Sequence, residues 1–126
     1  MGLEHGVSVI SVCSNVITVK IQGGFNLEGI LAFHKKMISI VEGFQAEKFK
    51  ILVDFLDADG ATADALNEAN KFNIWLNNKN LVAKAVVINS PALSEIFFSR
   101  APAQKLQNIK CFDNRAEGYE WLNLQL

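Results

Sequence analysis

Apolar and polar residues alternate along the first part of the chain in the manner of β-strands. The alternation covers residues 7–13, pauses at Ser14-Asn15 and resumes over residues 16–22. Two runs rich in β-branched residues and joined by a short polar turn predict an antiparallel hairpin. Gly23-Gly24 follows directly, and we expect these glycines to end the second strand.

Between residues 27 and 42 the apolar positions recur every three or four residues, which predicts an α-helix. Asn26 is suited to cap its first turn, because its side chain can accept a hydrogen bond from a backbone N–H that lacks a helical partner. Gly43 is expected to end it. The apolar positions form one stripe and a second that widens it, namely Leu27, Ile30, Leu31, Ile38 and Val41, and then Phe33, Met37 and Ile40.

Strands and helices alternate in the rest of the chain. Residues 49–55 and 83–88 are almost wholly apolar, which is typical of central parallel strands buried on both faces, and residues 109–112 form a last short strand. Helices are expected over residues 62–79, from Ser90-Pro91 to Arg100, and after Asn114. This order predicts an α/β fold, a mixed five-stranded sheet with an antiparallel N-terminal hairpin and the remaining strands parallel, packed with about four helices.

The composition fits a single domain over residues 1–126. Half of the residues are hydrophobic and a fifth are charged, which excludes a disordered chain, and two cysteines exclude a disulfide scaffold. Twelve basic and thirteen acidic side chains leave a net charge of −1. This balance carries no electrostatic signature of nucleic-acid binding.

The sequence also lacks the patterns of membrane proteins and exported proteins. No apolar run approaches the roughly 18 residues of a membrane-spanning helix, and the first residues lack the basic and apolar regions of a signal peptide. Cys13 and Cys111 form no Cys-x-x-Cys pair. We therefore expect a reduced, cytoplasmic protein without membrane insertion.

Three segments of the chain resemble the SpoIIAA-like domain, the fold of STAS proteins and anti-sigma-factor antagonists. They are Ile-Leu-Val-Asp-Phe at residues 51–55 with the acidic, glycine-containing stretch after it, Ala-Val-Val-Ile at 85–88 with the proline-led helix ending near Arg100, and Phe-Asp at 112–113 with Glu-Gly-Tyr-Glu-Trp-Leu at 117–122. The likeness covers nearly the whole chain from Val7 and is greatest to a bacterial branch of the family. It implies the SpoIIAA-like fold and a regulatory, protein-binding role.

One departure from the family's pattern affects its phosphorylation switch. Antagonists of anti-sigma factors carry Asp-Ser-Ser/Thr-Gly between the central strand and the next helix, and a kinase phosphorylates the hydroxyl. The corresponding stretch here is Asp57-Ala58-Asp59-Gly60, without a hydroxyl at either middle position. Two interpretations of Asp59 stay open, a permanent charge in place of the phosphate and a plain acidic helix-start loop. Thr62 offers a substitute hydroxyl for phosphorylation, but we interpret it as the helix N-cap.

No catalytic or metal-binding constellation is complete in the sequence. Asp57-x-Asp59 after an apolar strand is similar to the phosphatase motif of haloacid dehalogenases, but that motif needs Thr or Val where Ala61 stands. The same residues are only a fragment of a calcium loop. His5 and His34 have no partner at metal-ligand spacing, and His34 is expected to be a partly buried, hydrogen-bonded packing residue. We expect no enzyme activity, no metal and no cofactor.

Aromatic residues on two of the expected helices either pack against a neighbouring helix or form an exposed binding surface. Phe97 and Phe98 point about 100° apart on one helix, so a single packed face cannot hide both rings, and Trp75 lies off the apolar stripe of its helix. We predict a non-enzymatic regulatory or protein-interaction module that docks a protein partner or a second copy as a homodimer. The candidate contact residues are Asp57, Asp59, Gly60, Thr62, Trp75, Phe97, Phe98 and Arg100.

A second hypothesis is the binding of a small apolar ligand or lipid. Nine phenylalanines can line a cavity, and the CRAL-TRIO lipid-exchange domains have a related arrangement of strands and helices. Against this, we expect a chain of this length to leave little room for a pocket of the usual 300–1,000 Å³, roughly. The partner's identity, the oligomeric state and the physiological role are not readable from the sequence.

Overall fold

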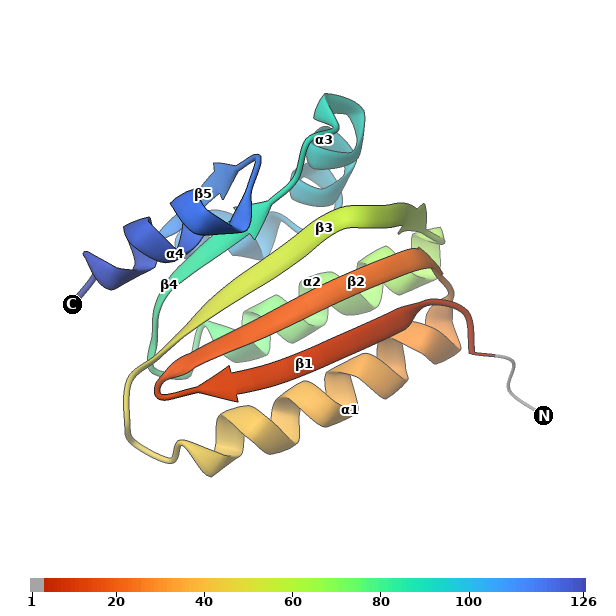
Figure 1. Ribbon diagram of the computed structural model, residues 1–126. Helices are drawn as coiled ribbons and strands as arrows, with labels where there is room; N and C mark the ends of the chain where they lie inside the picture. The colour runs from red at the N-terminus through yellow and green to blue at the C-terminus, as the bar shows by residue number, and fades with distance from the viewer. Residues whose placement is uncertain (1–3) are drawn as a thin grey trace.

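The computed structural model describes residues 4–126, which form a five-stranded sheet with the strand order β1-β2-β3-β4-β5 (Figure 1). β1 pairs antiparallel with β2, and the other neighbouring strands are parallel. This confirms the predicted α/β fold and its mixed sheet. In chain order the elements are β1 Val7–Cys13, β2 Val16–Phe25, α1 Leu27–Gly43, β3 Phe49–Ala61, α2 Ala63–Leu76, β4 Leu81–Val87, α3 Pro91–Arg100, the 3-10 helix η1 Pro102–Leu106, β5 Ile109–Phe112 and α4 Arg115–Asn123.

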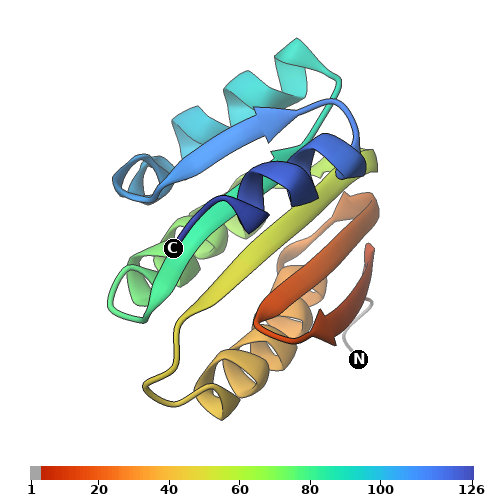
Figure 2. The same ribbon diagram turned by 60° about the vertical axis from the view of Figure 1, so that its left-hand side comes forward.

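The helices cover the two faces of the sheet unequally. Figure 2 shows α4 alone in front of the sheet, crossing β3 and β4, while α1, α2 and α3 lie behind it. Each predicted N-cap is in place: Asn26, Thr62, Ser90 and Asn114 accept a backbone N–H of the first turn of α1, α2, α3 and α4. Three helices therefore cover one face of the sheet, and a single helix covers part of the other.

The two central strands are longer than the sequence pattern predicts. Gly23-Gly24 was expected to end β2 and residues 56–61 were expected to be a loop, but both segments continue the parallel ladder to the pair Phe25 and Ala61. Gly23 has φ +75° and Gly60 has φ +111°. Glycine tolerates this left-handed backbone, so the register irregularity at Gly23-Gly24 is accommodated without ending the pairing. The acidic stretch is the end of a strand.

The buried apolar face of α1 lies within the two predicted stripes, with Leu31 as the exception. Phe33, Met37 and Val41 are buried, whereas Leu31 of the first stripe is 46% exposed. α1 packs against α2 as well as the sheet, and the ring of Phe33 lies 6.5 Å from that of Phe72 on α2. α1 ends at Gly43 as predicted, and the positive φ that follows it belongs to Gln45.

The sheet has a hydrophobic core on each face. The larger one, between the sheet and α1 and α2, contains Ile17, Val19, Met37, Ile51 and Leu76. The smaller one lies under α4 and contains Leu52, Ala85 and Leu122. Gly118 lets α4 approach closely, because a Cβ there would lie 3.0 Å from Cδ1 of Leu52.

Polar contacts fasten α4 to the sheet. Arg115 Nε donates to the buried carboxylate of Asp54 at 2.6 Å, and Lys50 Nζ donates to the Leu122 carbonyl at 2.7 Å. The hydroxyls of Thr18 and Tyr119 lie 2.6 Å apart and share a hydrogen bond. These contacts link both ends of α4 to β2 and β3. They therefore fix the position of α4 on this face of the sheet.

Substitutions of two leucines near the C-terminus test the packing of α4 against the sheet. Leu122 is fully buried and Leu124 is 78% exposed. Leu122→Ala should lower the free energy of unfolding by about 2–5 kcal/mol, because it leaves a cavity in a small core. Leu124→Ala is the matched control and should change it by less than about 0.5 kcal/mol. Urea unfolding measures both, and equal effects would contradict the packing of α4.

Candidate functional site

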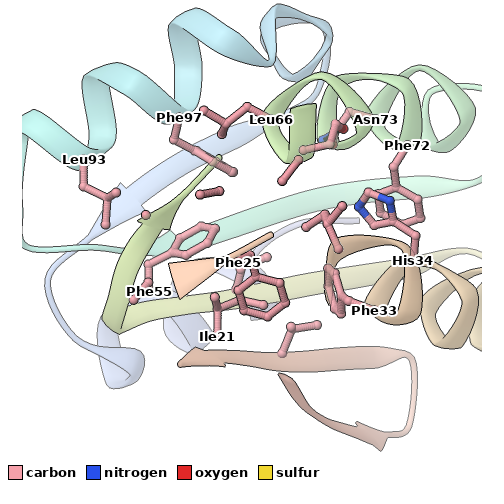
Figure 3. A pocket seen from close by; sticks show the side chains of 18 of the residues that line it. Ile21, Phe25, Phe33, His34, Phe55, Leu66, Phe72, Asn73, Leu93 and Phe97 are labelled. Atoms are coloured by element: carbon pink, nitrogen blue, oxygen red, sulfur yellow. Dashed lines mark hydrogen bonds between the residues drawn. The ribbon is translucent and has the colours of Figure 1, made fainter. Parts of the chain in front are cut away.

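An apolar cavity of about 300 Å³ lies between the sheet and helices α1, α2 and α3. Its floor comes from β2 and β3, and its walls come from the three helices. In Figure 3, Leu93, Phe55 and Phe97 lie at one end, and Asn73, Phe72 and His34 lie at the other. The cavity therefore extends from the α3 end, near the tip of β3, to the paired helices α1 and α2.

Aromatic rings form much of the cavity wall. Phe97 of α3 meets Phe55 of β3 edge to face, with ring centroids 4.7 Å apart, at the α3 end. At the other end the rings of Phe33 and Phe72 lie 6.5 Å apart. Such contacts add modestly to the burial of the rings.

His34 is a buried, neutral side chain in this wall. Its ring stacks on Phe72 with centroids 4.4 Å apart and planes 10° apart, and it is 6% exposed. Burial lowers the pKa of His34 from 6.5 to about 4, although nearby Glu68 opposes the shift. The prediction of a packing histidine is confirmed by this burial, but within residues 4–126 its side chain makes no hydrogen bond.

Lys84 of β4 is the one buried lysine of the described chain, 4% exposed. Its Nζ donates to Asn73 Oδ1 of α2 at 2.8 Å and to Gln104 Oε1 of η1 at 3.2 Å. Lys84 and Asn73 both line the cavity. Burial lowers the pKa of Lys84 from 10.5 to about 7, because the charged form loses hydration.

The predicted contact residues of the acidic stretch separate into different places. Asp57 is exposed and pairs with Lys20, Nζ to Oδ2 3.1 Å, at the surface. Asp59 is exposed and contributes with Gly60 to the α3 end of the cavity lining. The Thr62 hydroxyl accepts the Ala65 N–H at 3.4 Å, as expected of a helix cap, and donates to Asp64. The two carboxylates therefore do not share one site.

The predicted aromatic residues are half-buried, and their rings have partners inside the protein. Phe98 meets Phe97 edge to face at 5.3 Å. Trp75 stacks on Phe72 at 5.7 Å, behind the cavity wall, with the Lys79 ammonium 4.9 Å from its ring. Arg100 is exposed at the end of α3. Docking of a partner on this surface stays a prediction.

Comparison with known proteins places this fold in a family. The model of the family described as SpoIIAA-like matches residues 16–123. The chain belongs to the SpoIIAA-like family. The resemblance of the three sequence segments is thereby confirmed. A search of the curated proteins found no match.

Solved structures share the SpoIIAA-like architecture at low sequence identity. An uncharacterised DUF3478-family protein with a SpoIIAA-like fold from Shewanella loihica PV-4 has a TM-score of 0.72 at 17% identity, covering 97% of both chains. The anti-sigma factor antagonist SpoIIAA in its unphosphorylated form has a TM-score of 0.62 at 10% identity, covering 94% of this chain and 99% of its own. An anti-sigma factor antagonist from Mycobacterium paratuberculosis has 0.66 at 8%, covering 94% and 95%.

Other site types are not found in the described SpoIIAA-like chain. Within residues 4–126 no three His, Cys, Asp or Glu side chains gather closely enough to hold a metal ion. No helix of that part combines the length and apolar character needed to cross a membrane.

The polar residues of the cavity wall were missed by the sequence reasoning. A signal was present, since Lys84 interrupts an otherwise apolar strand in the way that Asp54 interrupts β3. A charged residue in a doubly buried strand needs a partner or a function. Asp54 forms an ion pair with Arg115. The amide partners of Lys84 come from α2 and η1, and no sequence pattern identifies them as its partners.

The pKa of His34 predicts a loss of stability in acid. Between pH 6.5 and about 4, His34 binds a proton in the unfolded chain but not in the folded protein. The free energy of unfolding therefore falls as the pH decreases. The contribution of this group is on the order of 3 kcal/mol. His34→Phe, which keeps the stacked ring, should remove this part of the pH dependence, and the exposed control His5→Gln should not. Urea unfolding between those pH values gives the comparison, and identical slopes for wild type and His34→Phe would refute it.

Proposed function

We propose that this SpoIIAA-like protein is a non-enzymatic regulatory module that binds a small apolar molecule in the cavity between the sheet and α3. The observation that carries this proposal is the cavity itself. Protein cores rarely leave voids larger than a water molecule, and about 300 Å³ bounded by apolar side chains falls at the lower end of ligand sites. The expectation that this chain has too little room for a pocket is therefore corrected.

The position of α3 supports a regulatory use of the cavity. Leu93, Ile96 and Phe97 line it, yet no residue of α3 is buried and Ile96 is 48% exposed. An element with few buried contacts is the one that shifts at least cost. A ligand at the α3 end therefore changes the position or the order of this helix first.

The outer side of α3 supplies a surface on which a partner can sense that change. Phe98 packs on Phe97, and Arg100 is exposed at the end of the same helix. Similarity to anti-sigma-factor antagonists supports a protein partner or a second copy as the molecule that binds this surface. Because residues 58 and 59 lack a hydroxyl, we propose that the ligand takes the place of phosphorylation at this point of the fold. Cytoplasmic location and homodimer formation stay predictions.

Filling the cavity tests the proposal. Ala69 of α2 is half-buried and lines the cavity, whereas Ala116 of α4 is exposed on the other side of the sheet. The uncharged dye N-phenyl-1-naphthylamine should bind wild type saturably with increased fluorescence. Ala69→Phe should weaken this binding at least about tenfold, because the ring occupies the ligand's space, and the matched control Ala116→Phe should not.

Native mass spectrometry of the purified protein provides an independent result. A co-purifying small-molecule adduct that is absent from Ala69→Phe supports the cavity as the site. Absence of saturable dye binding to wild type, together with a clean symmetric dimer without adduct, would instead favour a module that acts through protein contacts alone.

A further inference from the structure

The charged groups of the cavity lining are unevenly distributed. Asp59 is exposed at the α3 end, near the tip of β3. Lys84 is buried and bound to Asn73, which Figure 3 places at the opposite end beside Phe72 and His34. His34 is neutral near pH 7 because of its low pKa. The cavity therefore has an acidic outer end and a basic inner end with apolar side chains between them.

Lys84 has no carboxylate partner within residues 4–126. The ion pairs of this part of the chain are Lys20–Asp57, Lys71–Glu68 and Arg115–Asp54. An ammonium group buried without a counter-charge is costly. Two amide oxygens solvate Lys84 but do not neutralise it, and its lowered pKa reports that cost.

The hydrogen bonds of Lys84 are also incomplete. An ammonium has three N–H donors, and the described residues supply two acceptors, Asn73 Oδ1 and Gln104 Oε1. An anion that enters the cavity can accept the third and provide the missing charge. Hydrogen bonds to charged groups in such surroundings are among the stronger ones.

We propose that the ligand is a monoanionic amphiphile with a carboxylate head and a single short apolar tail, and that Lys84 binds the carboxylate. This inference rests on the proposed function and names the chemistry of its ligand. The tail lies among the apolar side chains toward Phe55 and Phe97, and the exposed carboxylate of Asp59 disfavours the reverse orientation. One buried cation matches one negative charge, and the amide oxygens beside it disfavour a dianionic phosphate head.

Two probes of equal chain length test the head group, decanoate and decan-1-ol, each displacing N-phenyl-1-naphthylamine. The assay is run at about pH 6, below the pKa of Lys84 and above that of a carboxylic acid. Wild type should bind decanoate roughly ten- to a hundredfold more tightly than decan-1-ol. Lys84→Met should lose this preference while it still binds the alcohol and the dye.

Lys110→Met is the matched control, since it removes the same charge from an exposed position of β5, and it should keep the preference. Lys84→Met replaces a buried charge by an apolar chain of similar length, so it is expected to fold. If Lys84→Met does not fold, the ratio of the affinities of wild type for decanoate and decan-1-ol tests the proposal by itself.

The outcomes separate the two proposals. Equal binding of decanoate and decan-1-ol to wild type, or an unchanged preference in Lys84→Met, overturns the role of Lys84 and leaves the cavity as an uncharged ligand site. Failure of dye, alcohol and carboxylate alike overturns the proposed function. Tighter binding of decyl phosphate than of decanoate overturns the choice of a carboxylate head.

Discussion

The parallel ladder between β2 and β3 is the constraint on which the rest of the structure depends. It continues past Gly23 and Gly60 to Phe25 and Ala61, and the Thr62 N–H donates to the Phe25 carbonyl at 3.0 Å. Because both strands end side by side, the first turns of α1 and α2 start from the same edge of the sheet. The two helices then run along one face, and the strand ends between them form the floor of the cavity.

The two faces of this sheet are packed in different ways. Under α4, Gly118 permits close approach and the Arg115–Asp54 pair holds the helix in one position. On the other face the rings of Phe55 and Phe97 meet under α3 with centroids 4.7 Å apart, beside the cavity. The α4 side is closely packed, whereas the opposite side contains the larger core together with the cavity and the weakly buried α3.

Two charged residues in central strands illustrate how structure separates similar sequence signals. Asp54 in β3 and Lys84 in β4 each interrupt an apolar run and are each buried. Asp54 receives a guanidinium from α4 and an N–H from Leu56, so its charge is compensated within the fold. Lys84 receives amide oxygens only. The difference makes one a structural anchor and the other a candidate ligand contact.

Local patterns determined the order of elements, the four helix caps and the parallel core, because each depends on residues close together in the chain: Thr62 and Ser90, for example, meet their N–H donors three residues later. The length of β3 and the cavity were decided by tertiary structure. Each depends on which distant residues face one another, as when Lys84, Asn73 and Gln104 converge from a strand and two helices. No spacing along the chain encodes such a meeting, since it follows from how the layers pack.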